Sequence, residues 1–518
     1  MPENTTVTLF RGRHVLIDAE DGIGRWIDDG AIAVAGATVR ESGPFETLRR
    51  RFPDATIIGD GSQIVMPGLI DAHTHGYGIT RVQAGVGYDF LENMLLDEPW
   101  RVSLPPDLGA ALTAVRHLAN GCTTLHHTGW DDLGPDAIGN AEKAIGAYRK
   151  TGIRLAYSPA IRNVNRFACD EKDFLETLPP DLRALARPFT EYDADEDEAR
   201  FFEVFEHLHA KYNGPDVRIL LGPSWAHGGT DRLMDRIRDR AAALGGVPIH
   251  IHTLQTPHQR AYGFKKYGRS LLAVLDDKGL VAPNTVFGHM VWISADDIAL
   301  LARRGASITH HASCNLHVRN GIAPVYELLR AGVNVAMGID DKSINDDEDP
   351  FMEMRLIHQL HRIPGFDLEG TPAITGAQVL RMATVNAAHV IGFGNRLGTL
   401  AAGHLADLVL VDAAPILDAP WTSPDADLLE TVVLRAKGSH VRTVVVGGQV
   451  VVEDGRFVGY DVEALFAEVK ALCARGLSNA QRARQEPIRR LIPFHQRWHN
   501  EMLAHLDVTE PFYRLNGR

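Results

Sequence analysis

The stretch "QIVMPGLIDAHTH" (residues 63–75) decides the predicted fold, because an apolar, strand-like run ends there in two histidines. His73 and His75 are two residues apart, and this spacing on a strand sends both imidazoles to the same side. Two such imidazoles are suited to bind a metal ion. The chain has 24 histidines, so a single pair would more often be ordinary packing, and the metal hypothesis needs support from other segments.

Seven further short apolar runs follow the first, and each is separated from the next by a longer amphipathic segment. They are "GCTTLHH" (121–127), "GIRLAYSP" (152–159), "VRILLGPS" (217–224), "VPIHIH" (247–252), "NTVFGHM" (284–290), "ASITHH" (306–311) and "GVNVAMGID" (332–340). Eight strands that each precede a helix are typical of a (β/α)₈ TIM barrel. The sequence therefore predicts an α/β protein built on a barrel at 63–397.

Two of the intervening segments show clear helix signals. The segment 230–246 places Leu233, Met234 and Ile237 on one helical face and ends in two glycines. In the segment 294–305, Ser294 is the predicted N-cap, and the acid three residues later completes a capping box. Both segments are predicted to be barrel helices.

The two ends of the chain have a different pattern. Residues 1–62 and 398–458 contain short Val- and Ile-rich strands with glycine turns, and we expect them to form one small β-sandwich domain from both termini. Residues 459–518 are predicted to be a C-terminal helical extension that packs against another subunit of a homo-oligomer. The acidic stretch 160–200 is expected to lie over the barrel mouth.

Composition excludes several classes of function. The 518-residue chain has a formal net charge of −13 and no cluster of Lys and Arg, which argues against a nucleic-acid partner. Its four cysteines form no CxxC pair, so neither a disulfide framework nor a thiolate zinc site is indicated. No signal peptide and no apolar stretch of membrane-spanning length is found. A soluble, cytoplasmic protein that acts on a small molecule is expected, with no membrane partner.

Further candidate ligands lie where predicted barrel strands end, which is where barrel enzymes keep their active sites. They are His250, His252, His289, His310, His311 and Asp340. Imidazoles and a carboxylate without thiolates suit a divalent metal that keeps an open position for water. Other polar residues are left open or given simpler roles. For His126, His127, His310 and His311, hydrogen bonding behind the ligands fits as well as ligation, and His495, His499 and His505 are expected to be solvated or at an interface.

Several motifs, in order and spacing, resemble the amidohydrolase superfamily. They are "VMPGLIDAHTH", "HIHTLQT", "GHMVWIS", "HHASCNLHVRNGIAPVYELLRAGVNVAMGID" and "LGTLAAGHLADLVLVD". The branch they most resemble contains triazine hydrolases and S-adenosylhomocysteine, guanine and related aminohydrolases, and the match extends to about residue 455. The resemblance implies a distorted barrel with a β-sandwich from the two termini.

The same resemblance implies the metal site. One divalent ion would be held by His73, His75, His252 and Asp340, with His289 facing the substrate. Two-metal relatives carry a bridging lysine on the fourth strand, and "VRILLGPSWAHGG" has none, so a single metal is expected. Zinc is expected first, although iron and manganese accept the same ligands.

Gln255 departs from the family pattern, in which a glutamate stands three residues after the metal histidine and moves protons. A neutral amide cannot transfer a proton, and loss of a general acid or base commonly costs about 10²- to 10⁴-fold in rate. Either Asp340 performs both proton transfers, or a nearby histidine supplies the second. We expect Asp340, His289 and Gln255 to be catalytic, and Trp225, His227, His311, Gln255 and His289 to contact the substrate.

The leading functional hypothesis is a metal-dependent hydrolase of a non-peptide carbon–nitrogen bond in an amide, urea, carbamate or lactam. The alternative is a deaminase or dehalogenase of a nitrogen heterocycle such as a triazine, purine or pyrimidine. An inactive scaffold is disfavoured because the ligand set is retained. Asp341 and Lys342 form either a structural ion pair or a contact that reads substrate polarity.

Overall fold

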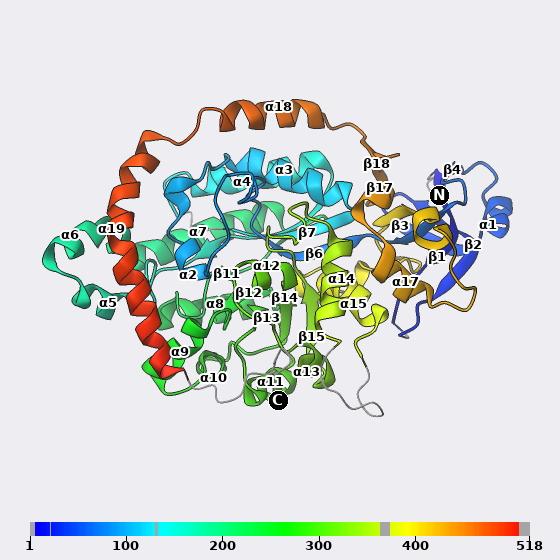
Figure 1. Ribbon diagram of the computed structural model, residues 1–518. Helices are drawn as coiled ribbons and strands as arrows, with labels where there is room; N and C mark the ends of the chain where they lie inside the picture. Colours follow the sequence, from blue (N-terminus) through cyan, green and yellow to red (C-terminus); the bar gives the residue numbers. More distant parts are fainter. Residues whose placement is uncertain (1–5, 21, 130–132, 363–372, 507–518) are drawn as a thin grey trace.

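The computed structural model describes residues 6–20, 22–129, 133–362 and 373–506. Figure 1 shows a central barrel surrounded by helices, a β-rich domain on one side of it, and two C-terminal helices that run across the top and down the opposite side. The N-terminal strands and the orange strands near residue 450 lie in the same β-rich domain, although they are far apart in sequence.

The barrel contains the eight parallel strands that the sequence predicts. They are β6 (Leu69–Thr74), β7 (Cys122–Thr128), β8 (Arg154–Ser158), β10 (Val217–Ile219), β12 (Ile249–Thr253), β13 (Thr285–His289), β14 (Ser307–His310) and β15 (Asn334–Met337). They form two four-stranded sheets, in the orders β10-β8-β7-β6 and β12-β13-β14-β15. At one seam the amide of His250 donates to the carbonyl of Leu221 at 2.9 Å, and at the other the amide of Asp340 donates to the carbonyl of His73 at 2.8 Å. The barrel prediction is confirmed.

Two of the predicted runs are not single strands. Residues 63–75 form β5 (Gln63–Pro67), which pairs with the terminal sheet, and then β6 of the barrel. Gly68 separates them at a close approach, because a Cβ there would collide with the Thr123 side chain. The fourth run is likewise split into β10 and the two-residue strand β11 (Gly222–Pro223), which pairs with β9 (Ala160–Ile161).

Helices follow the barrel strands and cover the outside of the barrel. The longer ones are α3 (Pro106–Ala119), α4 (Ala137–Thr151), α7 (Ala194–Tyr212), α8 (Asp231–Ala243), α9 (Pro257–Tyr267), α11 (Ala295–Arg304) and α14 (Pro350–Leu360), and the shorter ones include α10 (Leu271–Asp277), α12 (Ala312–His317), α13 (Val325–Arg330), α15 (Gly376–Met382) and α16 (Val385–Val390). Helix α8 buries Leu233, Met234 and Ile237 as predicted. Helix α11 has the predicted capping box of Ser294 and Asp297.

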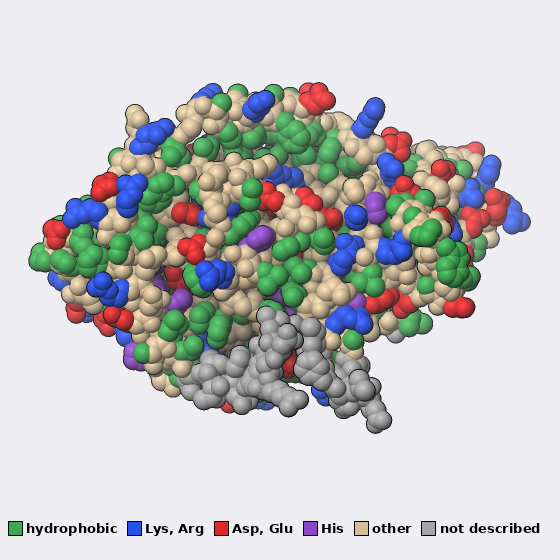
Figure 2. All heavy atoms as spheres, viewed as in Figure 1, with side chains coloured by type: hydrophobic (Ala, Val, Ile, Leu, Met, Phe, Trp, Pro, Cys, Tyr) green, Lys and Arg blue, Asp and Glu red, His purple; other side chains and the backbone are tan. Residues whose placement is uncertain are grey.

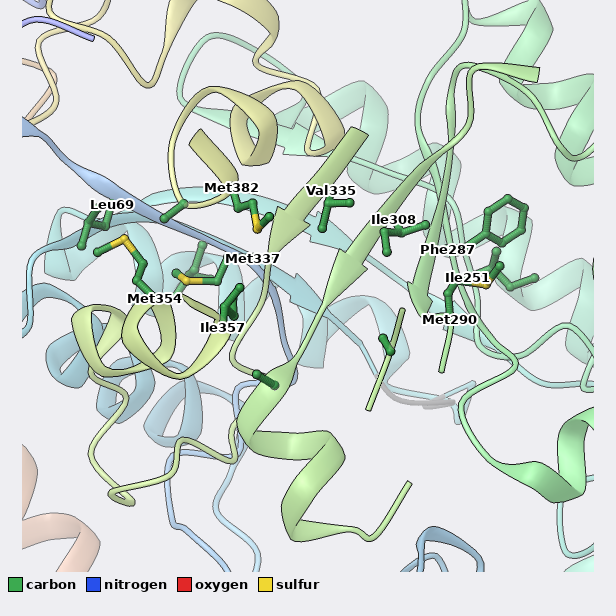
Figure 3. Packing of buried hydrophobic residues seen from close by; sticks show 14 of the residues in the cluster. Leu69, Ile251, Phe287, Met290, Ile308, Val335, Met337, Met354, Ile357 and Met382 are labelled. Carbon is green, nitrogen blue, oxygen red and sulfur yellow. The ribbon is translucent and has the colours of Figure 1, made fainter. Parts of the chain in front are cut away.

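The main hydrophobic core lies between the barrel strands and these helices. Figure 3 shows Ile251, Phe287, Ile308 and Val335, which come from four successive strands, with Met382 of α15 nearby. Each of these side chains is at most 2% exposed. This packing holds the strands rigidly, so the polar residues at the strand ends are fixed relative to one another.

The β-rich domain is one nine-stranded sheet in the order β19-β18-β17-β16-β5-β1-β2-β3, with β4 paired to β1. Its strands are β1 (Val7–Leu16), β2 (Trp26–Ala35), β3 (Thr38–Pro44), β4 (Thr56–Ile58), β5, β16 (Leu408–Asp412), β17 (Val441–Val446), β18 (Gln449–Glu453) and β19 (Arg456–Phe457). Strand β5 lies between β1 and β16, and a separate core that includes Phe10, Ile32 and Leu408 joins the two ends of the chain. Helices α1 (Phe45–Arg51) and α17 (Leu428–Arg435) complete this part. The predicted domain boundaries at residues 62, 398 and 458 stay predictions.

The C-terminal extension consists of α18 (Val462–Cys473) and α19 (Asn479–Met502). Helix α19 packs on α5 (Glu171–Thr177) and α6 (Pro180–Thr190) through an apolar cluster that includes Phe174, Leu182, Ile488 and Leu491. The expectation that His495 and His499 are solvated or at an interface is wrong. They are 2% and 4% exposed because α19 buries this face against its own chain, whereas His505 is exposed.

Figure 2 shows acidic and basic side chains interspersed over the visible face. Among the described residues, no helix combines the length and the apolar character needed to cross a membrane.

Candidate metal centre and active site

Five imidazoles and one carboxylate converge at the carboxyl ends of the barrel strands. They are His73, His75, His252, His289, His311 and Asp340, and none is more than 7% exposed. They come from β6, β12, β13, β14 and the turn after β15, so the parallel strand order brings together residues that are up to 267 positions apart. The structure thus places every predicted metal ligand in one region.

The possible ligand atoms form two overlapping groups that share His73. His73, His75 and His252 make one group, and His73, His289, His311 and Asp340 make the other; within each group the atoms lie within 4.8 Å of one another. The groups are in contact, because Asp340 Oδ1 lies 3.1 Å from His75 Nε2 and 3.7 Å from His73 Nε2.

Hydrogen bonds behind the cluster fix the orientation of its imidazoles. The Nδ1 atoms of His75 and His252 donate to the backbone carbonyls of Thr128 and Ser224 at 2.9 and 2.6 Å. Because a carbonyl can only accept, these bonds leave Nε2 as the ligand atom of each ring. His289 Nδ1 lies 3.0 Å from Asn315 Oδ1, which orients this ring in the same way.

His73 provides a test of whether these residues fit a metal ion. Its Nδ1 lies 2.7 Å from His250 Nε2, whereas its Nε2 is buried and has no hydrogen-bond partner among the described residues. A buried polar atom without a partner is costly, and a cation at this position would satisfy it. Together with the carboxylate, the donor set fits one divalent ion of the borderline class.

The electrostatics of the cluster favour the metal-binding protonation states. Burial, followed by the neighbouring imidazoles, holds the pKa of His73, His252 and His311 well below its ordinary value. Burial also lowers the pKa of His289 to about 4. These rings are therefore neutral near pH 7, which is the form that binds a metal.

Asp340 is held in a charged state within this buried cluster. Burial alone would raise its pKa, but the Lys342 ammonium and the contact with His75 lower it well below the ordinary value. Lys342 Nζ lies 3.1 Å from Asp340 Oδ1 and donates to the Asp340 carbonyl at 2.7 Å, and the Cys314 thiol donates to Oδ2 at 2.8 Å. The lysine is therefore the ion-pair partner of Asp340.

The neighbouring Asp341 has a structural role. Its carboxylate accepts hydrogen bonds from the Thr74 hydroxyl at 2.7 Å and from the His75 amide at 2.5 Å. Asp340 and Asp341 have φ values of 62° and 52°, in the left-handed region that non-glycine residues seldom adopt. These bonds tie the strained turn after β15 to the end of β6, which carries two of the predicted ligands.

Gln255 lies two residues beyond β12 and is 3% exposed. The backbone amide of Gln255 donates to Gln259 Oε1 at 2.9 Å, whereas the side-chain Oε1 of Gln255 has no hydrogen-bond partner among the described residues. Trp225 forms a parallel β-bridge with His252, with the ring centroids 5.7 Å apart. Trp225 and His227 line one small cavity together with Gln259, and of these candidate substrate contacts Trp225 is the one that contacts a candidate ligand, His252.

Of the four histidines whose roles were left open, only His311 belongs to a ligand group. The others have different partners. His126 contacts the Ala72 carbonyl and the Ser158 hydroxyl, His127 contacts the Tyr148 hydroxyl, and His310 contacts His361. They support neighbouring strands and helices rather than the ligand groups.

Sequence reasoning missed two supporting contacts. His250 was predicted as a candidate ligand, but it belongs to neither ligand group, and its contact with His73 joins strands on opposite sides of the barrel. Asp71 accepts hydrogen bonds from the amides of His73 and Ile339 and pairs with His117 at 2.9 Å. An acid two residues before the first ligand was the available signal for this contact.

A family model described as "Amidohydrolase family" matches residues 64–451, and a second, "Imidazolonepropionase-like composite domain, bacteria", matches residues 30–55. A 5-methylthioadenosine/S-adenosylhomocysteine deaminase of Syntrophobacter fumaroxidans is 30% identical over 473 residues, which cover 89% of this chain and 96% of the relative.

Two solved structures have the same fold. An adenosine deaminase from Xanthomonas campestris with bound zinc superposes with a TM-score of 0.75 at 25% identity and covers 90% of this chain and 98% of its own. An atrazine chlorohydrolase from Arthrobacter aurescens, complexed with zinc, gives a TM-score of 0.74 at 23% identity and covers 90% and 99%. The second likeness concerns the fold alone.

Proposed function

This chain belongs to the amidohydrolase family and is a metal-dependent hydrolase of carbon–nitrogen bonds, and from that premise we propose that it releases ammonia or an amine from a small nitrogen heterocycle. The heterocycle is favoured by the named activities of the relative at 30% identity and of the zinc-bound neighbour at 25% identity. The observation that carries the proposal is the buried cluster in which His73, His75 and Asp340 approach one another within hydrogen-bond or ligand distances.

We propose one divalent ion, zinc first, held by His73, His75, His252 and Asp340. The zinc in the Xanthomonas structure supports the choice of metal, and the unpartnered His73 Nε2 supports the choice of ligands. A divalent cation supplies, when bound, a water of lowered pKa and a polarised substrate bond.

The protein's own groups would then position the reactants and move the protons. Asp340 is ionised, so its carboxylate can accept a proton from the attacking water. His289 donates through Nδ1 to Asn315, and its Nε2 lies 3.8 Å from Asp340 Oδ2, where it can orient the substrate. His311, Trp225 and His227 are proposed as further substrate contacts, and Gln255 as a neutral hydrogen-bonding group beside them.

A second candidate is hydrolysis of an amide, urea, carbamate or lactam, and it is favoured by Gln255. This residue is buried beside the cluster and cannot carry the proton that a ring nitrogen requires. An amide, urea, carbamate or lactam has a carbonyl that accepts hydrogen bonds. Its hydrolysis, unlike that of a heterocycle, does not require the residue at position 255 to protonate a ring nitrogen.

A product screen with zinc-loaded protein tests both candidates. Amino-substituted purines, pyrimidines and triazines would be compared with anilides, phenylureas and lactams, with detection of ammonia, amine and carboxylate. Asp340→Asn is the matched inactive control. Ammonia or amine from the heterocycles supports the main proposal, turnover of only the second set supports the other candidate, and no turnover with either set contradicts both.

We also propose a cytoplasmic homo-oligomer. Three apolar side chains within residues 82–95, Val82, Phe90 and Leu95, are 61%, 40% and 37% exposed, and association of two copies would bury them. Light scattering on the purified protein tests this, and a monomer at micromolar concentration would contradict it.

A further inference from the structure

Helix α19 is placed against the substrate side of the barrel and not against its outer wall. The loop 162–169 follows β9, next to the β8 end of the barrel, and the segment 91–101 follows β6, so both belong to the face that carries the metal cluster. Figure 1 shows α19 in red beside α2 (Leu91–Met94), α6 and α9. A helix from the last sixty residues thus reaches two loops of the catalytic face.

Buried polar contacts attach α19 to the loop 162–169. Trp498 Nε1 donates to the Cys169 carbonyl at 2.7 Å, and His495 Nε2 donates to the Phe167 carbonyl at 3.1 Å. The Cys169 amide donates to His499 Nε2 at 3.5 Å. Because these backbone groups are buried, loss of a partner would leave them unsatisfied and the loop less well held.

The same helix also attaches to the segment after β6. Gln481 and Gln485 donate from Nε2 to the carbonyls of Arg101 and Pro99 at 2.8 and 2.9 Å, and Gln496 Nε2 donates to Asn93 Oδ1 at 3.1 Å. Helix α19 therefore fixes two loops that follow different barrel strands.

The two loops and α19 enclose a small cavity of about 30 Å³. It is lined by residues from all three segments and from the strand next to the metal cluster, among them Glu92, Arg162, Phe167, Trp225, His227 and His499. Trp225, which lines this cavity, is bridged to the proposed ligand His252, whereas none of the proposed ligands lines the cavity itself.

His499 also faces a polar chain that leads to Gln255. Its ring is 5.6 Å from that of His258, edge to face, and His258 Nδ1 lies 2.9 Å from Glu92 Oε1. The Thr256 hydroxyl donates to the same carboxylate oxygen at 2.7 Å. Thr256 directly follows Gln255. Helix α19 is therefore connected, through His258 and Glu92, to the segment in which Gln255 stands at the position of the family's glutamate.

We infer that α19 holds two loops of the catalytic face in place, and that Trp498 and His499 are positioning residues that determine substrate specificity by holding the loop 162–169. This inference rests on the proposed function only for the identity of the substrates. We therefore expect the part of the substrate remote from the reacting carbon to contact the loop 162–169, which α19 keeps in place.

The test uses the full-length, zinc-loaded protein with Trp498→Phe and His499→Leu, and with His505→Leu as the matched control, because His505 is exposed just beyond the same helix. Trp498→Phe keeps an aromatic ring and removes one hydrogen bond, so it tests the inference even if His499→Leu fails to fold. Amide hydrogen exchange of residues 162–170 would become about tenfold faster in the first two variants and would not change in the control.

Kinetics separate positioning from a merely structural role. With an amino-substituted ring that also carries a bulky group, we expect KM to rise about tenfold in Trp498→Phe, whereas KM and kcat for the same amino-substituted ring without the bulky group stay the same. Equal losses for both substrates, or unchanged exchange of residues 162–170, would overturn the inference. If the wild-type protein turns over no heterocycle, the proposed function fails, and the exchange result still decides the role of α19.

Discussion

His73 Nδ1 lies 2.7 Å from His250 Nε2, so the histidine pairs of β6 and β12 meet inside the barrel. His73 offers Nε2 as a candidate ligand atom, and His250 holds the His73 ring in orientation. Such a contact behind a metal ligand commonly contributes 10- to 100-fold in metal affinity.

His250→Phe should therefore weaken zinc binding by about 10- to 100-fold while the fold is preserved. Competition with a chromophoric chelator measures the affinity. His310→Phe is the matched control, because His310 is an equally buried imidazole at the end of β14 but contacts His361 outside both ligand groups. Equal weakening in both variants would show that the effect comes from disturbed packing.

Removal of the metal ligands should abolish turnover. We expect His73→Ala and Asp340→Ala to lose bound metal and all detectable activity while they retain the circular dichroism spectrum of the wild type. Metal content is measured by elemental analysis of the dialysed proteins. Wild-type activity in either variant would remove the proposed mechanism.

Lys342→Met should destabilise the metal-free protein more than the metal-loaded one. Lys342 compensates the buried charge of Asp340, and removal of one partner of a buried ion pair costs about 3 to 5 kcal/mol. A bound cation would replace the lost positive charge. Thermal denaturation with and without chelator measures the difference, and an equal loss in both states would contradict it.

Gln255→Glu should not improve the native reaction. The substitution adds a second carboxylate to a buried site in which the Gln255 Oε1 has no hydrogen-bond partner among the described residues. We expect kcat/KM to stay the same or to fall. Gln259→Glu, at the neighbouring buried amide, controls for the general cost of a new charge. A large gain in Gln255→Glu alone would mean that this position has lost an acid rather than acquired a useful amide.

The free energy of unfolding should fall between about pH 6.5 and pH 9. Burial alone would lower the pKa of His117, but the contact with Asp71 raises it to about 9, above the unfolded value of 6.5. The folded state therefore retains a proton that the unfolded state has released, and up to about 3 kcal/mol, fully present below pH 6.5, is lost as the pH rises.

Urea denaturation at pH 6, 7.5 and 9 measures this loss. His117→Gln can still donate one hydrogen bond to Asp71 but does not titrate, so its stability should change less over the same range. The same slope in both proteins would assign the effect to other groups.

Local patterns predicted the barrel and the strand ends at which the candidate ligands gather, because each signal lies within one short segment. The period of two in His73 and His75 and the capping box of Ser294 and Asp297 needed no knowledge of distant residues. The division of residues 63–75 into β5 and β6 was not predicted, because the apolar residues of the two strands form one uninterrupted run. Only the close approach of Gly68 to Thr123 separates the strands.

The burial of α19 could not be predicted in the same way. Its sequence is rich in arginine and has two internal prolines, which is typical of a solvent-exposed segment. Contacts with distant segments, such as those of His495 with the Phe167 and Phe174 rings and of His499 with the His258 ring, explain why these two histidines are inside. The Lys342 contact with Asp340 likewise depends on a turn with positive φ that the residue types alone do not specify.

The pairing of β5 with both β1 and β16 has a consequence for biosynthesis. During translation, the strands before residue 67 emerge from the ribosome more than three hundred residues ahead of β16, so β5 has an unpaired edge while the barrel is being made. An open edge is a template for wrong pairing between nascent chains. Pairing of β16 with this edge is therefore one of the last steps in folding, and chains that stall before β16 (Leu408–Asp412) has emerged should be prone to aggregate.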